Sequence, residues 1–306
     1  MIENTKQQVR EFYDQIGWSL IDDDLYQNAR YEDLRPVSGR YIHRCHLRVA
    51  RHLNPEGQFL LDAGSGPVQY PEYLEYSRSY QYRLCADISI TALREARRRL
   101  GEHGLYVVMD IAALPFKNDS FDGIVSLHTI HHLPEDEHLQ AYQELYRVLA
   151  PAGKAAVVNG WPDSQLMDFF EPLVRLSNRL RHRIQRLSSA EASPDGNTKS
   201  GGSGTDSKKS AGKRPSKTPK GTFTSRHDVE WIKSEVGGGM PVEIRVWRSV
   251  SVRFLRALIH PKLGGRLWLA VLFALEERFP HYFGERGKYP LIILTKYAGG
   301  SEKADV

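Results

Sequence analysis

The segment FLLDAGSG, from Phe59 to Gly66, constrains the fold of this chain most strongly. Its apolar beginning is typical of a short buried strand, and Pro71 begins a stretch that we expect to be helical. A strand, a glycine turn and a helix in this order form a ligand-binding corner of a parallel α/β sheet. The segment by itself leaves the ligand open.

Strand-like and helix-like patterns alternate along the rest of the chain. Alternation of this kind predicts a doubly wound, mostly parallel α/β sheet of the Rossmann-like type. We expect seven strands in this sheet, with helical insertions between some of them. The expected strands cover 59–62, 82–87, 105–110, 121–127, 154–159, 242–250 and 289–297, and the expected helices include 71–78, 91–100 and 135–149.

Composition divides the chain into consecutive parts. Residues 188–222 contain no apolar side chain larger than that of alanine, so they cannot offset the entropy of ordering and are predicted to be a disordered linker. The other predicted parts are an N-terminal helical lid (1–55), a ligand-binding core (56–160), a helical insertion (161–187), and the remainder of the same sheet (223–306) with a second helical insertion (253–283).

The positive charge is concentrated in the predicted linker. The chain has a net charge of +5, and residues 188–222 hold seven Lys or Arg and three Asp or Glu, which gives +4 of that total. A nucleic-acid-binding protein more often concentrates its charge on a folded face. We therefore expect no nucleic-acid partner.

Cysteine content and the N-terminus indicate the compartment. Cys45 and Cys85 are the only two cysteines, and we expect them to be free buried thiols. The first residues, MIENTKQQVREFYDQ, lack the basic and apolar blocks of a signal peptide. The longest apolar run, Leu267 to Leu275, is about half of the ~20 residues that a membrane span needs. These features predict a cytoplasmic protein.

Three acids follow successive expected strands. Asp62, Asp87 and Asp110 fall at the carboxyl ends of the first three strands, where open α/β sheets bind their ligands. Asp87 comes 21 residues after Gly66, a spacing that suits a carboxylate accepting both hydroxyls of an adenosine ribose. Gly64 and Gly66, without Cβ atoms, let the backbone approach the ligand.

Two classes of ligand compete for this corner. A dinucleotide fingerprint needs a third glycine, and Gln69 stands in its place. Asp62 would also repel a pyrophosphate at this turn. The same carboxylate would attract a cation, and S-adenosylmethionine carries a sulfonium and an ammonium with no phosphate. The residues therefore favour S-adenosylmethionine over NAD.

Five segments carry a resemblance to a known family. The chain resembles the class I S-adenosylmethionine-dependent methyltransferases, and within them the broad group that includes the ubiquinone and menaquinone methyltransferases. The resemblance covers residues 59–159 well and the final strands weakly, and five motifs in order are specific. The segments are LDAGSGP, CADIS, MDIAALPF, FDGIVSLHTIHHL and ELYRVLAPAGKAAVV.

The resemblance implies a role for each matched residue. The methionine end of the cofactor would meet Asp62 and the backbone of Ala63, Gly64 and Gly66. The ribose and adenine would meet Asp87, Ile88, Asp110 and Ile111. Leu127 and His128 would lie near the transferred methyl group, and the product would be S-adenosylhomocysteine.

Residues for the methyl acceptor are less specific. His131 and His132 are candidates for a general base, and ordinary packing near the cofactor is the alternative. No acidic residue or cysteine lies near these histidines at the spacing of a metal ligand, so no metal is expected. Tyr13, Tyr70, His128 and Trp161 are candidate acceptor contacts, and each could instead be a packing residue.

The insertions give the best indication of the acceptor. Residues 164–187 form a basic amphipathic pattern, and residues 253–283 are rich in Leu, Trp, Phe and Ile. They suggest a small hydrophobic acceptor, lipid-, quinone- or natural-product-like, and peripheral contact with a membrane surface; the alternative is that the two insertions only pack together as a cap. Two other functions stay open: a catalytically silent S-adenosylmethionine-binding scaffold and an NAD-dependent oxidoreductase.

Overall fold

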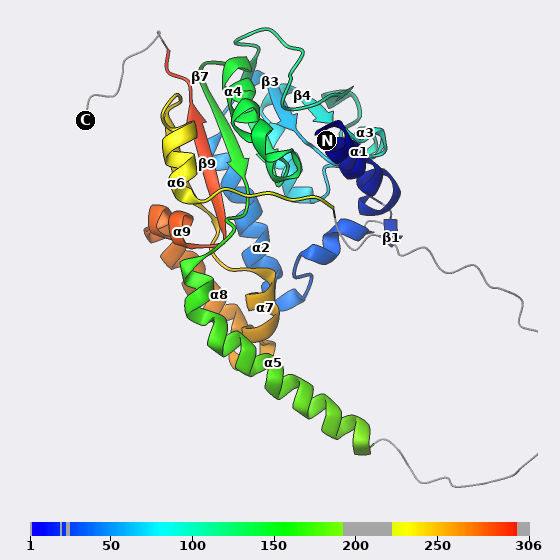
Figure 1. Cartoon of the computed structure of the whole chain (residues 1–306), viewed down its shortest axis with the longest axis vertical. Coiled ribbons are helices and arrows are strands. Elements are labelled where there is room, and N and C mark those ends of the chain that lie inside the picture. Colours follow the sequence, from blue (N-terminus) through cyan, green and yellow to red (C-terminus); the bar gives the residue numbers. More distant parts are fainter. Residues whose placement is uncertain (1, 19, 23–24, 192–221, 299–306) are drawn as a thin grey trace, which may run out of the picture.

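A seven-stranded sheet organises the chain (Figure 1). The computed structural model describes residues 2–18, 20–22, 25–191 and 222–298. The five strands numbered β3 to β7 are parallel to one another, whereas β9 is antiparallel to both of its neighbours. In spatial order the strands are β5 (Gly104–Val108), β4 (Tyr80–Asp87), β3 (Gly57–Ala63), β6 (Phe121–Leu127), β7 (Leu149–Val158), β9 (Tyr289–Thr295) and β8 (Val242–Arg248).

The strand order reverses between β3 and β6. The chain first adds β4 and β5 on one side of β3 and then returns to place β6 on the other side. Ligands of open α/β sheets bind in the crevice at such a reversal, outside the carboxyl ends of the strands. The glycine turn after β3 lies at this position.

Helices cover both faces of the sheet, as a doubly wound fold requires. One face packs against α4 (His138–Val148), α6 (Val229–Trp231) and η8 (Ile232–Val236), and the other against η3 (Val49–His52), η4 (Pro71–Ser77) and α3 (Ile90–Leu100). Helix α2 (Pro36–Arg48) contacts η4 and β8. Neighbouring strand residues alternate between the faces, since Leu61 joins the first core and Leu60 the second. The predicted fold class is confirmed.

Short elements complete the sheet domain. An unexpected two-stranded hairpin, β1 (Leu20–Asp22) with β2 (Leu25–Tyr26), follows the N-terminal helix. The expected helix at 71–78 is a 3₁₀ turn, and the expected third strand ends at Val108, so Asp110 lies in the following loop. The other elements are α1 (Ile2–Phe12), η1 (Tyr13–Gly17), η2 (Gln27–Tyr31), η5 (Gly101–His103), η6 (Ile130–His132) and η7 (Glu135–Glu137).

The two insertions form a second helical layer at one end of the sheet. They comprise α5 (Gln165–Glu191), α7 (Val252–Leu258), η9 (Pro261–Leu263), α8 (Gly265–Arg278) and α9 (Pro280–Arg286). α5, α7 and α8 pack with α2 around a separate apolar core that includes Val174, Phe254 and Phe273. The far end of α5 reaches beyond the rest of the molecule (Figure 1).

The predicted linker begins too early. Residues 188–191 continue α5, because SSAE contains no proline or glycine and the first helix breaker is Pro194. Thr222 lies at the start of the next described segment, and residues 192–221 lie outside the described residues.

No helix within the described ranges is long and apolar enough to cross a membrane.

Candidate functional site

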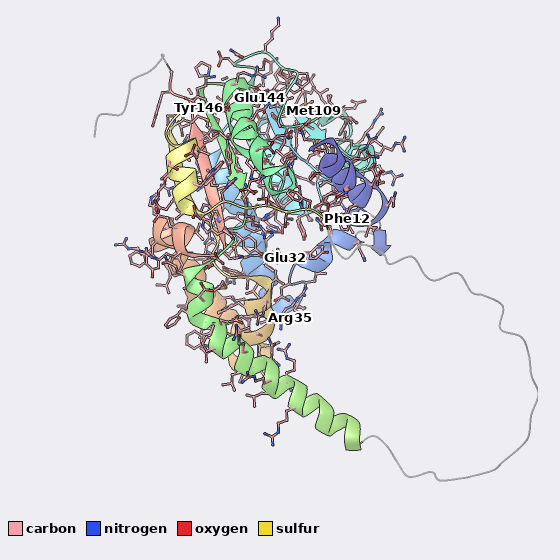
Figure 2. The ribbon with its side chains drawn as sticks, viewed as in Figure 1. Phe12, Glu32, Arg35, Met109, Glu144 and Tyr146 are labelled. Carbon is pink, nitrogen blue, oxygen red and sulfur yellow. The ribbon has the colours of Figure 1, made fainter. Side chains whose placement is uncertain are left out.

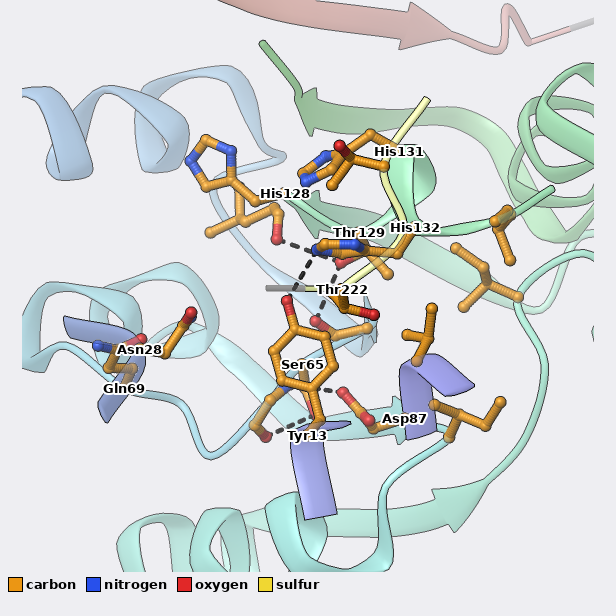
Figure 3. A pocket seen from close by; sticks show the side chains of 18 of the residues that line it. Tyr13, Asn28, Ser65, Gln69, Asp87, His128, Thr129, His131, His132 and Thr222 are labelled. Carbon is orange, nitrogen blue, oxygen red and sulfur yellow. Dashed lines mark hydrogen bonds between the residues drawn. The ribbon is translucent and has the colours of Figure 1, made fainter. Parts of the chain in front are cut away.

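A cavity of about 540 Å³ opens at the carboxyl ends of β3, β4 and β6. The N-terminal elements α1 and η1 cover it, together with a strap formed by residues 222–226. Figure 3 shows Tyr13 within it, with Asp87 on one side and the histidines on the other. We call the region around Gly64, Gly66 and Asp87 the glycine-turn part, and the region around His128, Trp247 and Tyr289 the aromatic part.

The glycine turn needs both of its glycines. Gly64 has φ of 79° and Gly66 has φ of 54°, in the left-handed region that residues with a Cβ rarely adopt. A Cβ on Gly64 would lie 2.1 Å from the Thr129 side chain, and one on Gly66 would lie 3.0 Å from the Trp18 ring. Any side chain here would therefore be strained and would push the covering residues away.

Asp62 lines the cavity, but its charge already has a partner. The Arg83 guanidinium on β4 donates to Asp62 Oδ2, from Nε at 3.1 Å and also from Nη2. Burial raises the pKa of Asp62, and the charge of Arg83 opposes that rise. The sequence analysis missed Arg83, although an arginine inside the apolar strand YQYRLCAD is a usable signal. Asp62 is thus part of a buried ion pair, and the expected attraction to a ligand cation is weakened.

Asp87 is held by the backbone at both carboxylate oxygens. Gly66 N–H donates to Oδ2 and Ser89 N–H donates to Oδ1, each at 2.8 Å. Burial raises the pKa of Asp87 to about 6, and these two hydrogen bonds limit the rise. Each oxygen keeps a lone pair for a further donor, so Asp87 fits the predicted role at a pair of ribose hydroxyls.

Asp110 lies beneath the N-terminal helix. Lys6 of α1 forms ion pairs with both Asp110 and Glu137, and so ties this helix to the loops after β5 and before α4. Of the nine residues predicted to bind the cofactor, eight line the cavity: Asp62, Gly64, Gly66, Asp87, Ile88, Asp110, Ile111 and Leu127. Ala63 does not, because its side chain faces the core and its carbonyl accepts the Ser126 hydroxyl at 2.9 Å.

Tyr13 bridges the N-terminal segment and the turn after β6. Its hydroxyl lies 2.8 Å from His132 Nε2 (Figure 3). Its ring stacks on Trp18 with centroids 5.0 Å apart. His132 Nδ1 lies 2.8 Å from the Phe223 carbonyl, which can only accept. Nδ1 therefore carries the proton, and Nε2 accepts from Tyr13. Burial lowers the pKa of His132 to about 4, so this network holds with a neutral imidazole.

The other two histidines are also neutral. Burial lowers the pKa of His128 to about 3 and lowers the pKa of His131 well below its usual range. His131 Nδ1 lies 3.3 Å from Asn159 Oδ1, whereas both nitrogens of His132 are engaged. A base for the acceptor thus stays a prediction, with His131 the freer of the two. Among the described residues, no cluster of three His, Cys, Asp or Glu side chains is placed to hold a metal ion.

The aromatic part is built from residues distant in the sequence. His128 meets the rings of Trp247 and Tyr289, with centroids 5.0 and 5.7 Å away, and Tyr70 also lines the cavity. Sequence reasoning missed Trp247, Arg248 and Tyr289, although an arginine and a tryptophan in the strand VEIRVWR were a signal. The structure places the fourth acceptor candidate elsewhere. Trp161 is buried in the sheet core and donates its indole N–H to the Gly284 carbonyl at 2.8 Å.

S-adenosylmethionine fits the residues of the glycine-turn part. Two buried donors there, Trp18 Nε1 and Gln69 Nε2, line the cavity and have no partner among the described residues. Buried donors are rarely left unpaired in folded proteins, so they indicate a polar ligand. Together with Asp87 and the Cβ-free turn, they suit the polar groups of a nucleoside with an amino-acid tail.

The sequence and the fold are both similar to known methyltransferases. The family model described as "Methyltransferase domain" matches residues 61–157. The chain is 30% identical over 130 residues to the "Probable tRNA methyltransferase 9B" of Mus musculus, a match that covers 42% of this chain and 28% of that protein. It is 30% identical over 119 residues to the phosphatidylethanolamine N-methyltransferase of Cereibacter sphaeroides, covering 37% of this chain and 55% of the relative. The chain therefore spans less than two thirds of either relative.

A solved structure shares the fold. Phosphoethanolamine N-methyltransferase 1 of Haemonchus contortus, in complex with phosphoethanolamine and S-adenosylhomocysteine, aligns with a TM-score of 0.52 at 12% identity. The alignment covers 100% of this chain and 52% of that one. At this identity the likeness concerns the fold alone.

Proposed function

We propose that this member of the class I S-adenosylmethionine-dependent methyltransferases methylates a small hydrophobic acceptor in the cavity described above. Membership rests on the methyltransferase domain over residues 61–157 and on the sheet that carries it. The cofactor is S-adenosylmethionine, so the NAD-dependent alternative is not retained. The acceptor is the part that we propose.

A single observation carries the proposal. The same cavity that contains the glycine-turn part continues into the aromatic part, where Tyr70, Trp247 and Tyr289 provide ring surface. Pockets for small molecules are typically apolar and aromatic, with a few polar groups that fix orientation. An acceptor with an apolar body would bury its surface against these rings and gain roughly 25 cal/mol per Å².

The chain's own residues have to position the two partners. When bound, the cofactor supplies a methyl group already activated on a sulfonium. Asp87 and the turn would hold its nucleoside end, while Tyr13 and Trp18 would cover it and exclude water. Placement of this kind contributes much of the rate in a reaction between two bound groups. Neutral His131 could take a proton where the acceptor releases one.

The names of the two relatives suggest two different classes of methyl acceptor, which an experiment has to distinguish. One is named for tRNA and the other for phosphatidylethanolamine. We favour the apolar molecule because the aromatic rings lie inside the cavity. Transfer of tritiated methyl from S-adenosylmethionine into a total lipid extract, and not into total tRNA, is the expected result. Labelling of tRNA alone would replace this proposal with a nucleic-acid acceptor.

A membrane surface is the proposed source of the acceptor. Phe169, Leu173, Leu176 and Leu180 recur every three or four residues along α5, so they form one stripe, and all four are more than half exposed. The predicted apolar face of this helix is therefore divided, because Phe170 packs against the helical core instead. Exposed arginines at positions 175, 179, 181 and 183 accompany the stripe. An apolar stripe with basic neighbours suits an anionic lipid surface.

Calorimetric titration tests the cofactor site. The protein is expected to bind S-adenosylmethionine and S-adenosylhomocysteine at micromolar concentration and not to bind NAD. Asp87→Ala removes the acceptor for two ribose hydroxyls, so we expect at least tenfold weaker binding of both sulfur ligands. Asp136→Ala is the matched control, since Asp136 is an exposed acid outside the cavity.

Binding of both ligands without methyl transfer to any extract would support the silent scaffold instead. Equal binding by the Asp87 and Asp136 variants would contradict the proposed ribose contact.

A further inference from the structure

Arg248 is a buried cation in the aromatic part of the cavity. Its side chain is 3% exposed, and its guanidinium carbon lies 4.7 Å from the ring centroid of Tyr289 and 5.0 Å from that of Trp247. Nη1 donates to Glu32 Oε1 at 2.5 Å. Glu32 lies beside Arg35 on the segment that leads into α2 (Figure 2). Arg248 thus joins the end of β8 to the N-terminal segment.

Two hydrogen-bond donors in this region have no partner. Nε of Arg248 and Nε1 of Trp247 are buried, and neither contacts an acceptor among the described residues. Both residues line the cavity and are adjacent on β8. Leaving a buried donor unpaired is costly, more so when it belongs to a charged group. Two such donors side by side indicate a ligand that brings acceptor atoms.

The chemistry of these donors selects the ligand. Neither the guanidinium nor the indole can accept a hydrogen bond, so an ammonium or amine N–H finds no partner at either group. A negatively charged oxygen gains a charge-assisted hydrogen bond from Arg248. Carboxylates and phenolates have oxygens of this kind and are compatible with the surrounding rings.

We propose that Arg248 and Trp247 bind an acidic oxygen, a carboxylate or phenolate, on the aromatic or otherwise flat body of the methyl acceptor. The inference rests on the proposed function, because it identifies the acceptor of the same cavity. Arg248 supplies the charge, Trp247 supplies a second donor, and Tyr289 supplies a ring face.

Glu32 provides a further test of the proposal, because its carboxylate competes with the ligand anion for the Arg248 guanidinium. Its Oε1 accepts from Arg248 and also from the Asp33 backbone N–H at 2.9 Å. The pair is neutral overall, so an incoming anion meets both an attractive and a repulsive charge. Removing the charge of Glu32 therefore strengthens anion binding, an effect that a purely structural role for Arg248 does not produce.

The test uses three naphthalene probes that differ only in their polar group. They are 2-naphthoate, 2-naphthamide and 2-naphthylmethylamine, titrated calorimetrically into the full chain saturated with S-adenosylhomocysteine. We expect 2-naphthoate to bind at least tenfold more tightly than the amide, and the amine to bind most weakly. Equal affinity for the three probes, or preference for the amine, overturns the proposal.

Variants assign the preference to the two residues. Trp247→Phe keeps an aromatic ring at this position and loses the N–H, so 2-naphthoate binding is expected to weaken several-fold while naphthamide changes less. Glu32→Gln is expected to strengthen 2-naphthoate binding several-fold. Because Arg248→Met leaves the buried Glu32 carboxylate without its charged partner, we pair it with Glu32→Gln and expect the preference for naphthoate to be lost. Arg245→Met, on the same strand but paired with Glu243 outside the cavity, is the control.

The two proposals fail in different ways. Loss of S-adenosylhomocysteine binding in the parent protein would count against the proposed function. Normal S-adenosylhomocysteine binding with no naphthoate preference, or with Glu32→Gln weakening naphthoate, would overturn only the anion site.

Discussion

Asp62 and Asp87 each end a parallel strand beside the same glycine turn, yet their surroundings differ. Asp62 faces the Arg83 guanidinium, whereas Asp87 is held by two backbone N–H groups. A carboxylate with a cationic partner keeps its charge without a ligand. A carboxylate that is buried with only neutral donors holds its proton more readily. We therefore expect Asp87 to be the acid whose ionisation makes cofactor affinity depend on pH.

Cofactor binding is expected to depend on the ionisation of Asp87. Burial raises its pKa from 3.8 to about 6. The ionised form accepts two hydroxyl donors, so S-adenosylhomocysteine should reach full affinity only about one pH unit above this pKa and should bind progressively more weakly as pH falls through it. Calorimetry between pH 5 and pH 8 measures this, and in Asp87→Asn the dependence should be lost. An affinity that stays constant down to pH 5 would contradict the assignment.

The same residue has an opposite effect on stability. Between about pH 4 and pH 6 the folded protein holds a proton on Asp87 that the unfolded chain releases, so its contribution to stability falls as pH rises through that window. His132 acts in the other direction. Its pKa falls from 6.5 to about 4, so the unfolded chain binds the proton first and stability is lost as pH falls below 6.5.

Among the elements, the N-terminal helix α1 is held over the cavity by polar contacts. Lys6 pairs with Asp110 and Glu137, and Tyr13, just beyond the helix, pairs with His132. These contacts join the helix to the loops that follow β5 and β6. Partly exposed ion pairs contribute little to stability, about 0.2–1 kcal/mol each. We expect their larger effect to be on the position of α1 over the cavity.

Lys6→Met is expected to change cofactor affinity more than stability. The variant unties α1 from Asp110, so we expect S-adenosylmethionine to bind several-fold more weakly while the melting temperature changes by no more than a few degrees. Calorimetry and thermal unfolding on the same samples separate the two effects. Lys117→Met, at an exposed lysine outside the cavity, should leave both unchanged. A large fall in melting temperature with unchanged affinity would show that α1 is a structural helix only.

Elements with a local pattern were predictable from the sequence. The observed bounds lie within a few residues of the expected ranges for β3, β4, β6 and α3. These elements were predictable because the apolar run or helical spacing that defines each of them lies within a single segment of the sequence. Pairings across long stretches of chain were not. Glu32 and Arg248 are 216 residues apart, and the position of β9 between β7 and β8 depends on a strand order that no local pattern encodes.

Considered as a whole, the molecule consists of a sheet that carries the cavity and a helical layer with a different surface. The helical layer exposes large apolar side chains on both α5 and α8, including Phe169 at 75%, Leu267 at 69% and Trp268 at 65%. Exposed apolar surface of this extent commonly marks an interaction site. The proposed partner, an anionic membrane, would use the arginines and the apolar stripe together.

Flotation with vesicles tests this surface. We expect the protein to float with vesicles that contain phosphatidylserine and not with pure phosphatidylcholine, because the arginines need anionic lipid. Leu173→Asp and Leu176→Asp place acids in the stripe and should each abolish flotation. Tyr297→Asp alters an exposed aromatic side chain that follows β9 and lies outside the helical layer, so this variant should float normally. Flotation that is absent for the parent protein would remove the membrane from the proposal.

The antiparallel strand β9 has a consequence for how the protein is made. It is the last strand of the described chain, and it pairs with β7 on one side and with β8 on the other. During synthesis, the edges of β7 and β8 that pair with β9 therefore keep unpaired backbone groups until β9 leaves the ribosome. Unpaired edges recruit other chains. The nascent protein is accordingly most prone to aggregation late in translation, after the residues of the glycine-turn part have already been synthesised.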